Sequence, residues 1–387
     1  MEEQRRETYL DNAATTYPKP EAVYLAMDRF AREVGGNPGR SGHHRSLEAA
    51  REVLRARDAV AKLLHVEESS HIVFTKNATE ALNLVIQGVL AHGGHAVITS
   101  LEHNSVWRPL EALARRGDVS YTIAQCRPDG GLDMARLEEA ILPTTRLLVC
   151  THASNVIGNL LPIADTAAVA ERHGIPLLVD AAQTAGRYEL DPAGMGLHYL
   201  AFSGHKELFG PQGTGALYIM PGWEIEPLLY GGTGSRSESS VQPDFLPDSC
   251  ESGTLNTLGL AGLRAGVEFI LEKGVGEIRR HDGMLTERLL DGLVRLQGIT
   301  VYGPEERERR VGLISFNLAG ISSTETASRL DQTYGICVRS GLHCSPLAHR
   351  TLGTMESGTV RASFSCLNTL EDVDRLLEAL GDMVRAF

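Results

Sequence analysis

Short apolar runs alternate with longer amphipathic stretches from about residue 70 to residue 220. The short runs are typical of strands that are buried on both faces. They predict strands over 71–75, 95–100, 118–123, 146–151, 175–180, 198–203 and 215–220. The longer stretches, such as 78–90 and 162–174, are amphipathic and predict helices. Strands separated by single helices predict an α/β domain, with a mostly parallel seven-stranded sheet flanked by helices.

The pattern changes after about residue 255. Two long helical segments, 257–273 and about 277–297, are followed by shorter apolar runs and two further helices. This succession predicts a smaller C-terminal α+β domain. The expected large domain is 17–255, and the expected small domain combines 1–16 with 256–387.

Composition excludes several classes of partner. The formal net charge is −12, and no lysine- or arginine-rich run occurs. Nucleic acids and anionic membranes need a concentrated positive surface, so neither is expected to bind. The N-terminal residues contain no apolar stretch suited to a signal peptide, and no run of about 18 apolar residues is present to span a bilayer. We therefore expect a cytoplasmic protein.

Six cysteines are scattered along the chain without a C-x-x-C pair. This spacing favours neither a zinc site nor a disulfide framework, and no bound metal is expected. Most of them are expected to be small core residues. Cys344 differs, because it follows Gly341, Leu342 and His343 in a loop rather than an apolar run.

A reactive amine can be sought by elimination, because only five of the 37 basic residues are lysines. Lys206 follows the predicted strand 198–203 at its carboxyl end, next to His205 and before a glycine-rich turn. That position suits an amine that forms a Schiff base. A surface lysine in a glycine-rich loop is the alternative. The other four lie in a turn, on a polar helix face, at a helix end and in a strand-to-helix loop, so Lys206 is the best candidate.

The strand 71–75 leads into a helix that opens at Asn77, Ala78 and Thr79. Free backbone N–H groups and a threonine hydroxyl at a helix N-terminus can hold a phosphate group. An ordinary N-cap, with Glu80 in the first turn, explains the same residues. Both interpretations stay open for this segment.

Asp180 ends the apolar strand 175–180. Burying a carboxylate there costs free energy unless a cation lies next to it. A protonated pyridine nitrogen is such a cation, and the pair would make a pyridine ring an electron sink. Gln183 follows one turn later and is suited to hydrogen-bonding a ring hydroxyl. A helix cap at the strand end is the alternative.

His103 and Asn155 follow the strands 95–100 and 146–151. The histidine suits either stacking on a flat cofactor ring and moving protons, or a structural role. Asn155 is either a polar residue at the active edge or a turn former. Successive strand ends thus carry, in order, the possible phosphate site at 77–79, His103, Asp180 and Lys206. Chance would rarely produce this order.

Eight segments spread along the chain have sequences that can be compared with those of known families. They are YLDNAATT (9–16), NPGRSGHH (37–44), TKNATEALN (75–83), VDAAQTAG (179–186), SGHKELFGPQGTGALY (203–218), GGTG (231–234), ESGTLNT (251–257) and RSGLHCSPLAH (339–349). Together they resemble the class V aminotransferase family of pyridoxal-phosphate enzymes, and within it the cysteine desulfurases and selenocysteine lyases. The resemblance implies the fold-type I architecture and pyridoxal 5'-phosphate as cofactor.

The resemblance also implies how the cofactor ring would be held. Lys206 would carry the Schiff base, and His103 would stack on the ring and take part in catalysis. Asp180 would pair with the pyridine nitrogen and Gln183 with the ring oxygen.

The phosphate would be held by residues at two strand ends, namely Asn77, Ala78, Thr79, Ser203 and His205. Thr233, in GGTG, would reach the phosphate of the neighbouring subunit. A homodimer with shared active sites is therefore implied. The implied substrate-binding residues are Ala14, His43, Asn155, Arg339 and Arg361, of which Asn155 and Arg361 would grip the substrate carboxylate.

Cys344 would decide the reaction. A thiolate, favoured by the nearby Arg339, is a suitable nucleophile for the sulfur of a bound cysteine. The resemblance therefore implies a cysteine desulfurase that releases L-alanine and leaves a persulfide on Cys344. The compact cysteine loop is similar to that of the group-II desulfurases, although Leu342 stands where a histidine is usual. A small acceptor protein or a reductant would take the sulfur.

Three alternatives stay open. A selenocysteine lyase has nearly the same chemistry. Transamination, epimerisation or β-lyase cleavage would need Lys206 but not Cys344. An interaction subunit would bind the cofactor and turn over no amino acid. A nicotinamide dehydrogenase is disfavoured, because no G-x-G-x-x-G follows the first strand.

Overall fold

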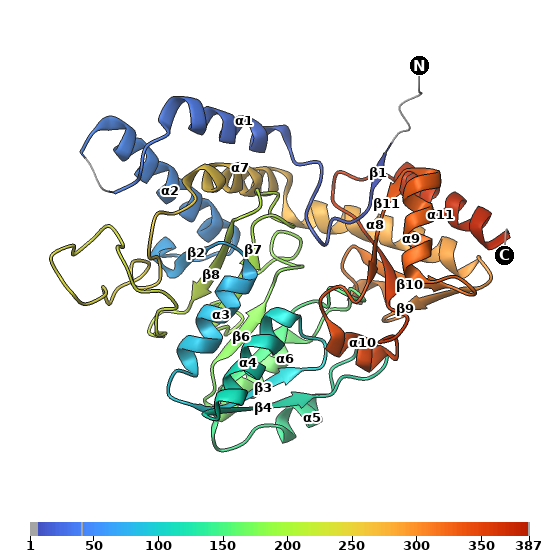
Figure 1. The fold of residues 1–387 in the computed structure, drawn as a ribbon, viewed down its shortest axis with the longest axis horizontal. Helices are drawn as coiled ribbons and strands as arrows, with labels where there is room; N and C mark the ends of the chain where they lie inside the picture. The colour runs from blue at the N-terminus through green and yellow to red at the C-terminus, as the bar shows by residue number, and fades with distance from the viewer. Residues whose placement is uncertain (1–6, 40–41, 386–387) are drawn as a thin grey trace.

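A seven-stranded sheet lies at the centre of the larger part of the molecule, in a computed structural model that describes residues 7–39 and 42–385 (Figure 1). Its strands are β2 (Ile72–Thr75), β3 (Gly94–Thr99), β4 (Val119–Ala124), β5 (Thr145–Thr151), β6 (Leu177–Asp180), β7 (Tyr199–Ser203) and β8 (Gly215–Ile219). Their order is β2-β8-β7-β6-β5-β3-β4, and only β8 runs antiparallel to its neighbours. The seven predicted strands and the mostly parallel sheet are confirmed.

Helices cover both faces of this sheet. They are α1 (Glu21–Arg29) with its π-helical continuation η1 (Phe30–Val34), α2 (His44–Leu63), α3 (Ala78–Val89), α4 (Asn104–Arg116), α5 (Met134–Glu139), α6 (Ile163–His173) and α7 (Thr257–Lys273). A short 3-10 turn, η2 (Ser69–His71), precedes β2. Side chains alternate along a strand, so Leu148 and Cys150 of β5 join the core with α2, α6 and α7. Leu147 and Val149 join the core with α3 and α4 on the other face.

The smaller part of the molecule contains two further sheets. One has the order β12-β13-β10-β9 and is antiparallel, and the other pairs β1 with β11 in parallel. Its strands are β1 (Thr8–Tyr9), β9 (Ile299–Tyr302), β10 (Leu313–Leu318), β11 (Ile336–Cys337), β12 (Arg339–Gly341) and β13 (Thr359–Ser363). Its helices are α8 (Val275–Val294), η3 (Arg307–Arg309), α9 (Ser323–Tyr334), α10 (Pro346–Leu352) and α11 (Leu370–Arg385).

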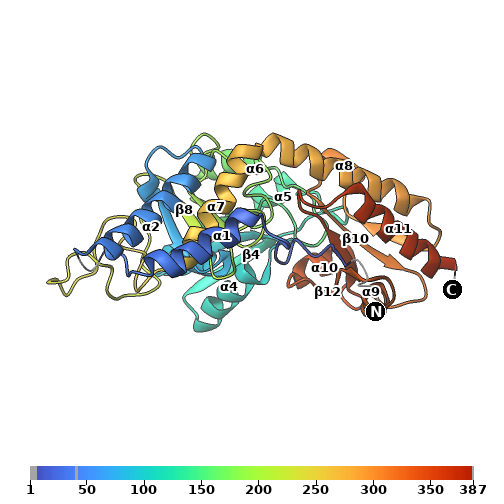
Figure 2. The same ribbon diagram turned by 90° about the horizontal axis from the view of Figure 1, so that it is seen from above.

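Helix α8 extends from the larger part into the smaller one (Figure 2). Its first buried residues, Val275 and Ile278, belong to the core of the large sheet. Leu285 and Leu289, further along the same helix, belong to the core of the smaller part. The two parts are therefore joined through a continuous helix as well as through loops.

Packing modifies the expected division of the chain. The N-terminal strand β1 pairs with β11, and Leu10 lies in the smaller core, as the expected division has it. Helix α7 differs, because its buried Leu260, Leu263 and Val267 lie in the core of the large sheet. An amphipathic pattern shows that a helix covers a core but not which core, so the sequence placed α7 in the small domain. Residues 1–6 and 386–387 of that expected domain lie outside the described residues.

The fold places the predicted chemistry at one edge of the sheet. Strands β2, β3, β5, β6 and β7 point the same way, so their carboxyl ends meet at that edge. The candidate residues follow these strand ends. Over the described ranges, no helix is long and apolar enough to cross a membrane.

Candidate active site

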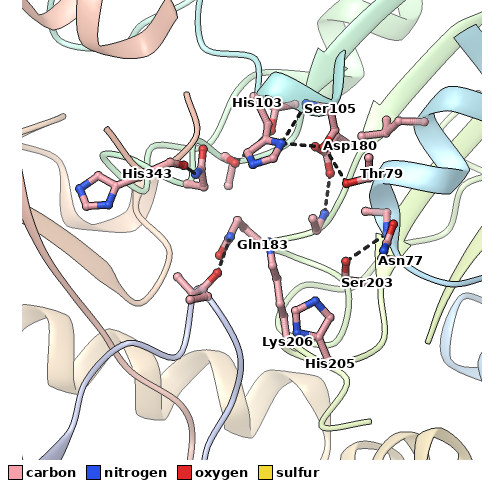
Figure 3. Close-up of a pocket in the computed structure, with 18 of the residues that line it drawn as sticks. Asn77, Thr79, His103, Ser105, Asp180, Gln183, Ser203, His205, Lys206 and His343 are labelled. Carbon is pink, nitrogen blue, oxygen red and sulfur yellow. Dashed lines mark hydrogen bonds between the residues drawn. The ribbon is translucent and has the colours of Figure 1, made fainter. Parts of the chain in front are cut away.

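A cavity of about 240 Å³ opens at the carboxyl edge of the large sheet, where the two parts of the molecule meet. Thirteen of the sixteen residues singled out in the sequence line it: Ala14, Asn77, Ala78, Thr79, His103, Asn155, Asp180, Gln183, Ser203, His205, Lys206, Arg339 and Arg361. Figure 3 shows Asn77, Thr79 and Ser203 together at one end and His343 at the other. The cavity therefore has one end built by α3 and another next to the cysteine loop.

Lys206 and Asp180 are the charged pair at the centre of this cavity. Burial lowers the pKa of Lys206, and the carboxylate of Asp180 partly opposes that shift. Burial raises the pKa of Asp180, although the N–H of Ala182 donates to Oδ1 at 2.9 Å. Burial thus disfavours the charged form of each group, and the charge of Lys206 does not fully compensate for the burial of Asp180.

A chain of hydrogen bonds fixes the ring of His103 (Figure 3). The ring caps α4, and its Nδ1 accepts from the N–H of Ser105 at 3.0 Å. The hydroxyl of Ser105 lies 2.8 Å from the same Nδ1 and 2.7 Å from Oγ1 of Thr79. Burial and then the positive charge of Lys206 lower the pKa of His103 to about 3. The ring is therefore neutral, and its proton lies on Nε2, because Nδ1 accepts a hydrogen bond.

Sequence reasoning missed Ser105, which joins the histidine to the start of α3. Its signal was present in the sequence: a serine two residues after His103, in the first turn of the helix that follows β3.

The start of α3 combines the two roles that the sequence left open. Oδ1 of Asn77 accepts from the N–H of Glu80 at 3.0 Å, so Asn77 is an N-cap. The N–H of Ala78 donates to Oγ of Ser203 at 3.1 Å. Nδ1 of His205 is buried and makes no hydrogen bond with the described residues. A helix N-terminus, a hydroxyl and an unpartnered ring nitrogen therefore lie together, as an oxyanion requires.

Cys344 lies in the four-residue connection between β12 and α10. Its thiol is exposed, unlike those of the other five cysteines, which are buried or half-buried. Nη2 of Arg339 lies 3.4 Å from its Sγ. Cys344 itself does not line the cavity, but its neighbour His343 and Arg339 do. The thiol is thus placed beside the cavity and next to a guanidinium group.

Arg361 is only 1% exposed and faces the cavity from β13. Its Nη2 lies 2.8 Å from Oδ1 of Asp11, and its Nη1 donates to the backbone oxygen of Asn155 at 2.9 Å. Burial lowers the pKa of Arg361, and Asp11 partly opposes this shift. Its Nε is buried without a partner among the described residues. The guanidinium is therefore held rigidly and keeps one unused donor.

Besides Cys344, two predicted residues lie outside the cavity of their own chain. Thr233 lies in the irregular segment between β8 and α7, where its hydroxyl is 3.3 Å from Oγ of Ser235. His43 caps α2, and its Nδ1 accepts from the N–H of Ser46 at 3.2 Å. Arg40 and Ser41, from the same NPGRSGHH segment, lie outside the described residues. The roles of Thr233 and His43 stay predictions.

Comparison with known families agrees with this geometry. A family model described as aminotransferase class-V matches residues 8–376. The chain belongs to the class-V aminotransferase family. This member of the family is 37% identical over 386 residues to a probable cysteine desulfurase from Methanothermobacter thermautotrophicus, covering 98% of this chain and 95% of that protein.

Two solved structures have the same fold. A cysteine desulfurase from Thermococcus onnurineus superposes with a TM-score of 0.91 at 33% identity, covering 98% of this chain and 95% of that chain. A cysteine desulfurase from Escherichia coli gives a TM-score of 0.88 at 29% identity, with the same two coverages. The predicted fold class is confirmed.

Enzymes of this family use pyridoxal phosphate, and the cavity fits that group. Asp180 is buried and needs a cation, which a protonated ring nitrogen would provide. Nδ1 of His205 is a buried nitrogen without a partner, at the end of the cavity where α3 begins. Lys206 supplies an amine whose pKa is lowered. Among the described residues, no cluster of His, Cys, Asp and Glu is arranged to hold a metal ion.

Proposed function

We propose that this class-V aminotransferase is a pyridoxal-phosphate-dependent cysteine desulfurase that converts L-cysteine into L-alanine. The C–S bond of cysteine breaks, an S–S bond forms, and the sulfur stays on Cys344 as a persulfide. The observation that carries the proposal is the exposed Cys344 thiol, 3.4 Å from Nη2 of Arg339 and beside the cavity with Lys206 and Asp180. The full-length similarity to proteins named cysteine desulfurases supports it.

Five residues of the cavity have a part in this proposal. When bound, pyridoxal phosphate supplies an electron sink for the bonds at the α-carbon of the amino acid. Lys206 would attach the cofactor, and because burial lowers the pKa of its Nζ, the amine gives up its proton more readily than an exposed lysine does. Asp180 would pair with the ring nitrogen, and His103 presents Nε2–H from a fixed ring. Asn155 and the unused Nε of Arg361 bind the substrate carboxylate.

A second copy of the chain completes the site in this proposal. Thr233 and His43 lie outside the cavity of their own chain, and we assign them to the cavity of the partner in a homodimer. The segment that carries Thr233 exposes large apolar side chains: Leu229 is 51% exposed, Tyr230 69% and Val241 74%. Several large apolar side chains exposed on one segment favour its burial against another protein. This supports a dimer in which that segment is covered.

The sulfur leaves through a partner that comes to Cys344. Four residues join β12 to α10, so the loop is too short to carry the thiol far from the cavity. A small acceptor protein or a reducing thiol is therefore the expected sulfur acceptor.

The test is to measure alanine and sulfide released from L-cysteine under anaerobic, reducing conditions, with wild type and Cys344→Ala. Equal amounts of both products from wild type, and their loss in the variant, are expected. Pyruvate in place of alanine, or activity that survives the substitution, would contradict the proposal and favour a lyase or a transaminase. The ratio of turnover on selenocysteine and cysteine separates the desulfurase from a selenocysteine lyase.

A further inference from the structure

We propose that Ser345 is a positioning residue for the Cys344 thiol and that it acts through the side chain of Asn155. The inference rests on the proposed desulfurase function and adds to it a residue that does not line the cavity. Ser345 follows the nucleophile directly and is fully buried, with 0% of its surface exposed. It therefore acts on the reaction only through the groups it contacts.

The backbone around the nucleophile has an unusual conformation. The φ angles of His343 and Cys344 are 49° and 61°, in the left-handed region that side chains other than glycine rarely adopt. Within the described ranges, no other two consecutive non-glycine residues have positive φ. Such a conformation persists only where surrounding contacts hold it. The contacts on this turn therefore decide where Sγ of Cys344 points.

Two hydrogen bonds hold the turn through its carbonyl groups. The backbone oxygen of His343 accepts from Nδ2 of Asn155 at 2.6 Å. The backbone oxygen of Cys344 accepts from the N–H of Asn104, the first residue of α4, at 2.9 Å. Both donors lie at the carboxyl edge of the large sheet, Asn155 in the loop after β5 and Asn104 at the start of α4. The nucleophile of the smaller part is thus fixed to the residues that surround the cavity.

Ser345 orients the amide that makes the first of these bonds. Its hydroxyl donates to Oδ1 of Asn155 at 2.6 Å. An amide group has one accepting end and one donating end, so a donor at Oδ1 keeps Nδ2 directed at His343. Without the hydroxyl, Oδ1 would lose its donor from Ser345, and the amide could turn over so that Nδ2 no longer faces His343.

The same amide also faces the substrate. Asn155 lines the cavity, and one of its two Nδ2 hydrogens bonds to His343, which leaves the other for the substrate carboxylate. Ser345 therefore sets the direction of a group that serves both the substrate and the nucleophile.

The first test compares Ser345→Ala with wild type, both as holoenzyme. We expect kcat for alanine formation to fall about tenfold, the effect of losing one buried hydrogen bond, with a smaller change in KM for cysteine. In the resting enzyme at pH 7, iodoacetamide should alkylate Cys344 severalfold more slowly in the variant, because the thiol moves away from Arg339. Mass spectrometry of the peptide that contains Cys344 measures this rate. Ser323→Ala is the matched control, since Ser323 is also buried and donates one hydrogen bond, to the backbone oxygen of Ser357 at 2.8 Å.

The second test asks whether the effect passes through Asn155. Asn155→Asp can accept from Ser345 but has no N–H for His343, so it should slow alkylation as well. If Ser345 acts through Asn155, adding Ser345→Ala to that variant slows alkylation no further. Additive effects of the two substitutions on the alkylation rate would overturn the inference. So would a kcat and an alkylation rate of Ser345→Ala that stay within twofold of wild type. An equal loss of kcat and alkylation rate in Ser323→Ala would overturn it as well. A wild type that makes no alanine would instead refute the desulfurase function, and the alkylation rates would still test Ser345.

Discussion

A buried ion pair ties the segment that carries Thr233 to the large sheet. Arg57 of α2 and Glu251 form two hydrogen bonds, of 2.7 Å from Nη1 to Oε1 and 2.8 Å from Nη2 to Oε2. Both side chains are 7% exposed. Oε1 of Glu251 also accepts from the N–H of Phe74 in β2 at 2.6 Å, and the guanidinium lies 4.6 Å from the centre of the Phe74 ring. We predict that Glu251→Gln strongly destabilises the protein.

The size of the effect follows from what the substitution leaves behind. A glutamine still accepts from the N–H of Phe74, so that hydrogen bond is kept. The guanidinium of Arg57 stays buried without an anion, which costs about 3–5 kcal/mol of unfolding free energy. Glu251→Ala should cost a further 1–3 kcal/mol or so, because the N–H of Phe74 is then unsatisfied as well.

Urea unfolding of the cofactor-loaded enzyme measures these costs, at one fixed protein concentration because cofactor binding and association both shift stability. Arg57→Met combined with Glu251→Gln is the control, since it removes the unpaired charge and keeps the acceptor for Phe74. It should be more stable than Glu251→Gln alone. A cost below about 1 kcal/mol for Glu251→Gln, or a double variant as unstable as the sum of its parts, would refute the reasoning.

Three other predictions concern the cavity and its surroundings. Lys206→Ala should lose the visible absorption of lysine-attached cofactor, whereas Cys344→Ala should keep it; an unchanged spectrum in the lysine variant would remove its assigned role. Asp180→Ala should retain cofactor but lower kcat for alanine formation about a hundredfold or more, and near-normal turnover would contradict this. Burial raises the pKa of Glu102 from 4.5 to about 8, so the folded state keeps a proton that the unfolded state releases. The contribution of Glu102 to stability therefore falls as pH rises from about 4.5 to 8. In urea unfolding, the free energy of unfolding of Glu102→Gln should rise relative to that of wild type as pH increases over this window. Curves of unfolding free energy against pH that run parallel for the two proteins would contradict the prediction.

The sequence could predict the sheet and the residues at its strand ends, because both depend on local order along the chain. Asp180 ends an apolar strand and Lys206 follows one closely, so the strands set their positions, and both residues line the cavity. Asn77 shows where this reasoning reaches its limit. A phosphate-binding helix start and an N-cap use the same residues, and only the contact with Glu80 shows that Asn77 is a cap.

Other features depend on contacts between distant parts of the chain. Ser345 is joined to Asn155 across 190 positions of sequence, and nothing in the RSGLHCSPLAH segment indicates that contact. The sequence placed α7 in the small domain for a similar reason, because its apolar face alone does not show which core it covers. Thr233 and His43 belong to a third case, since their predicted roles depend on a second copy of the chain.

Helix α8 has a mechanical consequence for movement between the two parts of the molecule. Its apolar residues begin in one core, with Val275 and Ile278, and end in the other, with Leu285 and Leu289. A rigid rotation of one part against the other would have to bend this helix or pull one end of it out of its core, and packed interiors resist both. The helix therefore resists relative rotation of the larger and the smaller part, which both contribute residues to the cavity.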